Sequence, residues 1–443
     1  MERMSKDAIS SSQDGQGGVL FKGLELATDE QPVANGVPRL RRPDRRQMSM
    51  RTASLDSMLP EDHQARIVWE YVEGLDLSSL YEGMRCVEGR CGRDATDPRI
   101  HMALWLYATL DGVGAARELD RLCKDHVAYQ WICGGVSVNY HSLSDFRSNN
   151  VELLDKLLTK SVAGLMHEGL VKMNRVAQDG IRVRASAGTS SFRRGETLER
   201  LESEARQQVQ ALRQELQGDA SAASRRQQRI ARARQVLPDV EQRKRDKKDQ
   251  ARASTTDPDA RFIKMSDGGV RPAYNVQFAT DTESQIITGV DVGNIGSDMG
   301  QMGQMIDQHK DRYGRPPGEM LADGGFASRD DIDSASTADE PTVIYAPVQI
   351  SRKTGTPCYD RQPADTDAVA QWRERMATPE AKDIYKQRAS TAECVNALAR
   401  NRGLQQFLVR GLRKIRAVAL WFALAHNLAR SISLRRQLAL AAG

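Results

Sequence analysis

Three acidic residues of this 443-residue chain are placed to hold metal ions. Asp179 lies within a segment that alternates apolar and polar residues, Asp323 ends a short apolar segment before two glycines, and Glu393 lies among small residues in a predicted helix. Two-metal phosphoryl transfer needs two or three carboxylates around a pair of divalent ions about 4 Å apart. Oxygen ligands of this kind suit Mg²⁺. Metal-assisted phosphoryl transfer is therefore one chemistry open to this chain.

Each acid also has a plain structural interpretation. Asp179 alone is compatible with a turn acid, and Asp323-Gly324 is an ordinary turn dipeptide. Glu393 and Arg400 are compatible with an ion pair on a solvated helix face. Other acids compete with them for the role: Asp267, Asp281, Asp291, Glu374 and Glu380. Residue types alone leave the choice open.

The predicted helix around Glu393 carries further groups suited to phosphate. With Tyr385 as the reference, an ideal α-helix places Arg388 at about −60°, Asn396 at about +20°, Arg400 at about +60° and Glu393 at about +80°. One face thus presents a tyrosine, two arginines and a glutamate. That face suits a metal ion flanked by guanidinium groups, which bind phosphate with two hydrogen bonds.

Periodicity predicts the elements that must position these groups. Alternating or short apolar segments bounded by turn residues indicate five strands, at 175–185, 273–280, 286–292, 319–322 and 342–347. Helical spacing indicates helices at 300–313 and 330–335 and a long helix from Thr378-Pro379-Glu380 to Gly403, whereas 350–378 looks irregular. The order predicts a mixed α/β sheet whose first three strands pair as a meander. Asp179 then lies on the first strand, Asp323 at the end of the fourth and Glu393 on the late helix.

The rest of the chain reads as helices and a leader. Residues 1–57 form a basic leader of disordered composition, and 58–173 an all-α domain of four to six helices, including 115–133 and 151–167. Residues 174–443 hold the sheet. A charged helical hairpin interrupts this part at 195–251, with a leucine stripe on its first helix and basic residues at 243–248 on its second.

Composition narrows the class of protein. No apolar run reaches the length of about 18–20 residues that a membrane span needs, and the first forty residues lack the apolar core of a secretory signal, so we expect a cytoplasmic protein. The six scattered cysteines favour reduced thiols over a zinc site. After Glu393 the chain has nine basic residues and no acid, which suggests contact with a polyanion or an ordinary solvated face.

The chain resembles bacterial insertion-sequence transposases of the DDE class, which have a ribonuclease-H-like catalytic domain. The resemblance covers about 58–430 and rests on four segments: 115–146, 176–187, 321–326 and 385–402. The family's glutamate helix looks like Tyr-x2-Arg-x3-Glu-x6-Lys, and here it is Tyr385-x2-Arg388-x4-Glu393-x6-Arg400. One extra residue thus separates Arg388 from Glu393.

The resemblance implies a mechanism and a set of partners. Asp179, Asp323 and Glu393 would hold two Mg²⁺ ions, with Mn²⁺ as a substitute. Water would cut a phosphodiester at the element's end, and the freed 3′-hydroxyl would attack target DNA. The residues implied to contact DNA are Tyr385, Arg388, Arg400, Arg182 and Arg184. The all-α domain would read the terminal inverted repeats of double-stranded DNA, and the hairpin would clamp DNA or another protomer. A homodimer would cut both ends of the element. It would act in the cytoplasm, at the nucleoid, and not at a membrane.

Three other functions remain open at this point. A nuclease of the same fold would cut DNA without joining it, and it would need the same carboxylates. A repressor derived from a transposase would bind DNA and would not depend on Asp179, Asp323 or Glu393. A helical scaffold protein would explain the hairpin at 195–251 but not the acids carried on strands.

Overall fold

The computed structural model describes residues 52–84, 86, 94–214, 219–243, 250–351 and 355–442. The predicted leader, 1–57, therefore lies almost wholly outside the described residues, and so does the basic segment 244–248. The first described element is a short 3-10 helix at Asp56–Met58.

Seven helices follow it in the described part of the predicted all-α region, more than the four to six expected. They are α1 (Gln64–Glu73), α2 (Ser78–Glu82), α3 (Pro98–Leu110), α4 (Ala116–Asp125), α5 (Val127–Cys133), α6 (Tyr140–Asn149) and α7 (Val151–His167). The prediction of one helix over 115–133 is wrong, because the backbone turns extended at His126 and this residue caps α5 by accepting a hydrogen bond from the Ala128 amide. The predicted helix at 151–167 has the predicted bounds.

The sheet has the predicted mixed topology. Its strands are β1 (Arg175–Arg184), β4 (Arg261–Lys264), β5 (Val270–Asp281), β6 (Ile287–Gly293), β7 (Glu319–Leu321) and β8 (Val343–Tyr345). Strand β5 pairs antiparallel with β1, β4 and β6, so the predicted meander is confirmed. Strands β7 and β8 continue the sheet in parallel on the other side of β1. Strand β4 was not predicted.

Helices cover the sheet and end the chain. They are α10 (Gln301–Tyr313), α11 (Arg329–Thr337), α12 (Asp367–Ala377), α13 (Pro379–Arg388), α14 (Cys394–Asn401) and α15 (Leu412–Ala442). The prediction that 350–378 is irregular is wrong for its second half, where Thr366 caps α12 and Arg373 of that helix binds the buried Asp365 carboxylate at 2.7 Å. This ion pair joins the loop to the helix.

The long helix around Glu393 contains a π-helical turn. Residues Ala389–Glu393 form this turn between α13 and α14. A π-helix holds one residue more per hydrogen-bonded turn than an α-helix. The turn therefore absorbs the extra residue between Arg388 and Glu393. The predicted ideal α-helix, which separates the two side chains by about 140°, is wrong here.

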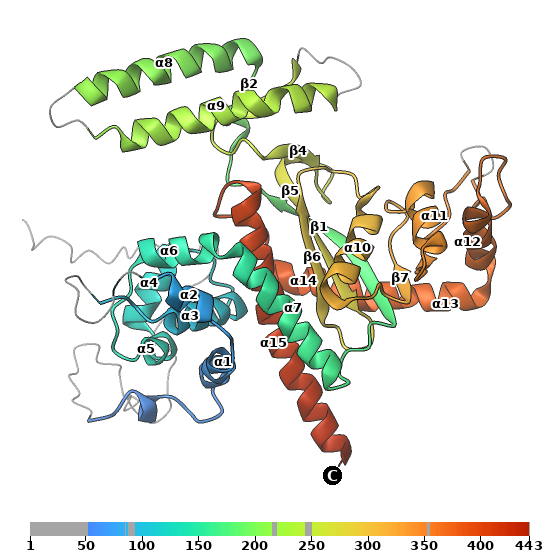
Figure 1. The fold of residues 1–443 in the computed structure, drawn as a ribbon, viewed down its shortest axis with the longest axis horizontal. Helices are drawn as coiled ribbons and strands as arrows, with labels where there is room; N and C mark the ends of the chain where they lie inside the picture. Colours follow the sequence, from blue (N-terminus) through green and yellow to red (C-terminus); the bar gives the residue numbers. More distant parts are fainter. Residues whose placement is uncertain are drawn as a thin grey trace, which may run out of the picture. The chain divides into compact units, whose positions relative to one another are not determined.

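Helix α15 runs through the core that the first seven helices share with the sheet (Figure 1). It packs on α3, α6 and α7 and on β6. The buried Trp421 indole donates a hydrogen bond to the Arg147 carbonyl of α6 at 3.0 Å. By length and composition α15 is also long and apolar enough to cross a membrane, contrary to the sequence analysis, but 67% of its most apolar window is buried inside the protein, as in a core helix.

The basic tail meets acids of the protein itself. Arg413 pairs with Glu152 at 2.7 Å. Arg416 pairs with Asp155 at 3.3 Å, and Arg435 with Glu168 at 2.8 Å. Glu152 and Asp155 lie on α7, and Glu168 directly follows that helix. These three arginines therefore hold α15 to α7, which reduces the share of the tail charge that is available to a polyanion.

The inserted hairpin forms as predicted and stands on a small sheet of its own. Helices α8 (Gly195–Gln214) and α9 (Ser221–Gln242) pack against each other. Two short strands, β2 (Phe192–Arg193) and β3 (Ala253–Ser254), pair where the hairpin leaves and rejoins the main sheet. A separate apolar cluster that includes Leu198, Ala233 and Leu237 joins the two helices to β3.

Candidate functional site

The three predicted acids meet around one guanidinium group. Arg388 Nη2 lies 3.2 Å from Asp179 Oδ1 and 4.0 Å from Asp323 Oδ2, and Arg388 Nη1 lies 3.5 Å from Glu393 Oε1. The Arg388 side chain is only 12% exposed. Residues separated by up to 214 positions in sequence thus share one charge centre.

The sheet topology brings Asp179 and Asp323 together. Strand β7 pairs with only the first three residues of β1, so the middle of β1 has an open edge beside the end of β7. Asp323 follows β7 at that edge, and its carboxylate accepts a hydrogen bond from the Gly325 amide. The site therefore lies where α/β sheets place ligands, at the carboxyl end of a strand.

Asp179 is the most buried of the three acids. Its side chain is 18% exposed, against 47% for Asp323 and 63% for Glu393. Burial raises its pKa above the ordinary value, the Arg388 charge opposes this, and the neighbouring carboxylates of Asp323 and Asp298 add to it. The site thus has a closed floor at Asp179 and an open rim at the other two acids.

Two residues beside Asp179 were not given a role in the sequence analysis. The buried Asn396 amide donates to Asp179 Oδ2 at 2.9 Å. The ideal wheel already placed Asn396 on that helix face. Asp298 is a fourth carboxylate, which accepts from Asn275 at 2.6 Å, from Gln277 at 2.8 Å and from Arg182 at 3.1 Å. It lies in the loop after β6, beyond Gly293, and does not end an apolar segment as Asp323 does.

The structure places the residues predicted to contact DNA in different surroundings. Tyr385 lies near the three acids, and burial raises the pKa of its hydroxyl. Arg182 binds Asp298, and alternation along β1 places its side chain on the face opposite to Asp179. Arg184 and Arg400 are exposed, and no ion pair joins either of them to another residue that the structure describes. Of these five residues, only Arg388 forms ion pairs with the three predicted acids.

The donor set fits a divalent cation. Carboxylate oxygens are the ligands that Mg²⁺ prefers, and here they already surround a positive charge. Within the described ranges, no three acidic, histidine or cysteine side chains are close enough to hold one ion together. Arg388 lies between them instead, and its buried Nε has no hydrogen-bond partner. The residue types fit the ion, and the position of Arg388 sets how far apart the carboxylates stand.

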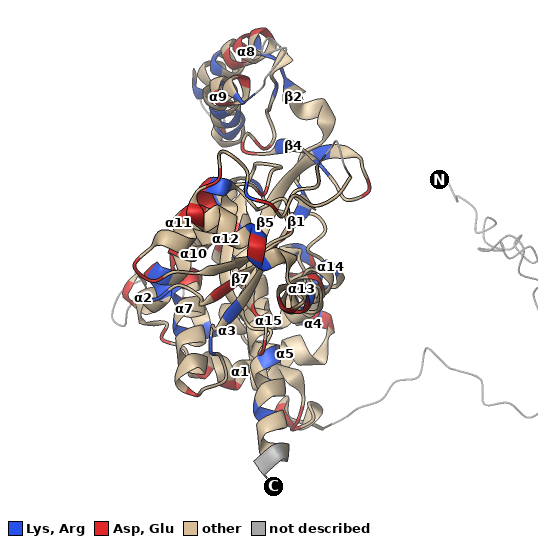
Figure 2. Ribbon diagram, turned by 90° about the vertical axis from the view of Figure 1, so that its right-hand side faces the viewer, with Lys and Arg blue, Asp and Glu red and all other residues tan. Residues whose placement is uncertain are grey.

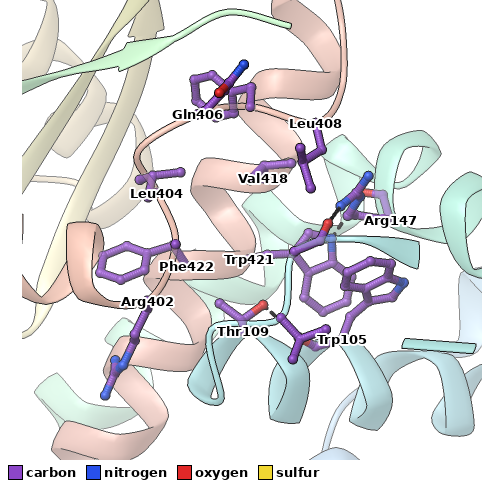
Figure 3. A pocket seen from close by; sticks show the side chains of 14 residues that line it. Trp105, Thr109, Arg147, Arg402, Leu404, Gln406, Leu408, Val418, Trp421 and Phe422 are labelled. Carbon is purple, nitrogen blue, oxygen red and sulfur yellow. Dashed lines mark hydrogen bonds between the residues drawn. The ribbon is translucent and has the colours of Figure 1, made fainter. Parts of the chain in front are cut away.

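A separate cavity of about 70 Å³ lies between the first seven helices and the C-terminal segment (Figure 3). Trp105, Trp421 and Phe422 make much of its lining, and the Arg147 guanidinium stands over the Trp105 ring at 4.6 Å. No acidic residue lines it. We interpret it as a seam in the shared core.

Two family models match the chain. "Transposase domain (DUF772)" matches residues 53–149, which run from the first 3-10 helix to the end of α6. "Transposase DDE domain" matches residues 355–432, which include Arg388 and Glu393. Asp179 and Asp323 lie outside both matches, so their place in the site rests on geometry. Searches of curated proteins and of solved structures found no significant match. With the mixed sheet and the helical first region, the two family matches identify this chain as an insertion-sequence transposase of the DDE type.

Proposed function

We propose that this transposase cuts DNA at the ends of its element and joins the freed 3′-hydroxyl to target DNA. Asp179, Asp323 and Glu393 would hold two Mg²⁺ ions, or Mn²⁺ in their place. The observation that carries the proposal is the convergence of these three acids, from a strand, a strand end and a helix, on Arg388 within 4.0 Å.

The residues of the site have separate tasks in this proposal. When bound, divalent ions supply charge that stabilises the attacking and leaving oxygens of a phosphodiester. Asn396 and the Gly180 amide orient the Asp179 carboxylate through hydrogen bonds of 2.9 Å each. Arg388 pairs with a DNA phosphate in exchange for part of its carboxylate contacts. The exposed rim at Glu393 admits a long substrate.

The remaining partners follow from the family. Transposases act on DNA, and DDE enzymes use divalent metal ions. The helical region 58–173 would read the terminal inverted repeats, Tyr385, Arg400 and Arg184 would contact the backbone, and a homodimer in the cytoplasm, at the nucleoid, would hold both ends. Arg182 would act through Asp298 instead, because that carboxylate occupies its guanidinium.

A joining assay tests the proposal. Duplexes that carry the inverted repeats flanking the gene, pre-cut to expose the 3′-hydroxyl, are incubated with plasmid and Mg²⁺. We expect integration by the natural protein, and a loss of at least about 10³-fold in each of Asp179→Asn, Asp323→Asn and Glu393→Gln, because removing one group from a catalytic constellation costs this much. Chelation of the metal should abolish the reaction.

Each rival has its own outcome in this assay. Hydrolysis without integration indicates a nuclease, and unchanged DNA binding by all three acid variants in a protein without any cleavage indicates a repressor. Calorimetric titration with Mn²⁺ adds a readout that does not depend on turnover. We expect the acid variants to bind Mn²⁺ more weakly, and equal binding would contradict the assignment of these ligands.

A further inference from the structure

A basic groove lies between the base of the inserted hairpin and strand β4 at the edge of the main sheet. Its volume is about 570 Å³, within the range of about 300–1,000 Å³ of pockets that hold small ligands. Its lining comes from β2, the end of α9, the segment before β3, strand β4 and the segment after β6. Figure 2 shows Lys and Arg positions in blue on the hairpin helices and on β4 beneath them.

The groove has a surplus of positive charge. Arg243, Arg252 and Arg261 line it, and no acidic residue does. Arg243 has two long contacts of 3.5 Å, an ion pair with Asp239 and a hydrogen bond donated to the side-chain oxygen of Asn294. Arg261 donates to the backbone carbonyls of Pro258 and Ala260. Arg252 is exposed and has no ion pair with another described residue. The Arg252 guanidinium therefore favours binding of an anion, and phosphate matches its planar geometry.

Aromatic side chains stand among these arginines. Phe192 of β2 and Phe262 of β4 lie with ring centroids 4.4 Å apart. Phe262 is 43% exposed, on an edge strand and at the groove. Aromatic rings beside basic groups form the surfaces on which proteins stack the bases of single strands. Three guanidiniums around one open ring match the phosphates and the base of a nucleotide, so we take a nucleic acid and not a protein as the partner.

The groove adjoins the carboxylate site. Gly296 lines the groove, and its carbonyl accepts a hydrogen bond from Arg182 at 3.1 Å. The same Arg182 nitrogen binds Asp298, the acid whose charge acts on Asp179. Gly296 and Asp298 are two residues apart, so their Cα atoms lie within about 7 Å. A strand held in the groove would lead towards the cut.

We propose that this groove binds unpaired nucleotides of the DNA strand next to the cleavage point, with a base stacked on Phe262 and phosphates paired with Arg243 and Arg252. The proposal rests on the proposed function and assigns the hairpin a task in it. The Phe262 ring can stack on the face of a base only where that face is exposed, so we expect a single strand as the occupant.

Fluorescence anisotropy with a labelled twelve-nucleotide oligo-dT, measured in EDTA over a series of salt concentrations, tests this. We expect the full chain to bind the probe. Phe262→Ala should weaken binding roughly tenfold, the effect of losing one base–aromatic stack. Arg243→Gln with Arg252→Gln should weaken it further and reduce the salt slope by about 1–1.5, because two phosphate contacts are lost.

Matched controls keep charge and hydrophobicity equal. Arg200→Gln with Arg271→Gln removes the same charge from exposed positions that pair with acids four residues away, outside the groove. Val270→Ala truncates an exposed apolar residue of β5 outside the groove. Both controls should bind oligo-dT as the natural protein does. Thermal melting verifies that every variant is folded.

Several results would overturn the proposal. One is a natural protein that does not bind oligo-dT, and another is an equal loss of affinity for it in the groove and control variants. If the groove variants lose affinity only for duplex probes, the groove is a duplex clamp. Because oligo-dT binding is measured without metal, its result does not depend on the proposed catalytic function. If Asp179→Asn still joins DNA, the catalytic proposal fails and the groove proposal stands. If the groove variants bind oligo-dT as the natural protein does and Asp179→Asn no longer joins DNA, the groove proposal fails and the catalytic proposal stands.

Discussion

Arg388 and Gly180 set the geometry of the site at the scale of single residues. Arg388 holds three carboxylates that would otherwise repel one another across a small volume. Gly180 follows Asp179 on β1 and faces Asp298 and its two amide donors from β5. A hydrogen atom in place of a side chain is what allows those three groups to approach the strand.

We predict that Gly180→Ala destabilises the protein and disturbs Asp298. A Cβ atom there would lie 2.6 Å from Gln277 Nε2, 2.8 Å from Asn275 Oδ1 and 2.8 Å from Asp298 Oδ1. Overpacking of this kind costs about 1–3 kcal/mol. Urea denaturation measures the loss, with Gly164→Ala as the control. Gly164 lies within helix α7 and nothing stands within 4 Å of its added Cβ, so that variant should gain about 0.5–1 kcal/mol. Equal effects of the two changes would contradict the proposed crowding.

The π-helical turn Ala389–Glu393 decides the site at the scale of elements. Five residues around a π turn return the chain to nearly the same side, so Arg388 and Glu393 point at each other across 3.5 Å. Thr391 Oγ1 donates to the Gln387 carbonyl at 2.9 Å and satisfies a backbone group near the turn. The inserted residue therefore changes the helix and not the arrangement of the site.

Deletion of Ser390 should be tolerated. It shortens the Arg388-to-Glu393 spacing to four residues, which a regular α-helix also places on one face. We expect stability and DNA joining close to those of the natural protein. Deletion of the exposed Ala397 in regular α14 rotates the following turn by about 100° and moves the buried Ala399. That control should cost more than about 2 kcal/mol in denaturant unfolding. Loss of joining in the Ser390 deletion, in a protein that still folds, would assign the π turn itself a catalytic role.

At the scale of the whole molecule, the part that the structure describes is built around helix α15. Residues Ala53–Gly443 form one unit, and α15 contributes to a core shared by the first seven helices and the sheet. A change of secondary structure near 174 therefore does not separate the two regions in packing. Motion of the helical region relative to the carboxylates would have to break this core.

We predict that Trp421→Ala weakens both regions together. Trp421 is 1% exposed and donates its indole N–H to Arg147. Truncating a buried tryptophan costs about 3–5 kcal/mol. Near- and far-ultraviolet circular dichroism should report one coincident unfolding transition at lower denaturant, whereas Leu440→Ala, 84% exposed on the same helix, should change little. Two separate transitions in the Trp421 variant would mean that the regions fold independently.

Local patterns in the sequence determined much of this protein. Alternation of apolar and polar residues located β1, β5 and β6, because the period of a strand is set by neighbouring residues. Asp179 was identified together with β1, on which it lies. The break at His126, helix α12 and strand β4 were missed, because apolar periodicity does not show what marks them. One side chain caps each of α5 and α12, and β4 is a four-residue strand that pairs with β5 directly after it.

Only the tertiary structure decided how the groups meet. It joined Asp298 to the site, gave the tail arginines acidic partners on α7 and beyond its end, and placed the groove of Phe262 beside the carboxylates. These are distances between separate elements. Periodicity describes one element at a time, so it predicts which side a residue faces but not which residue it finds there.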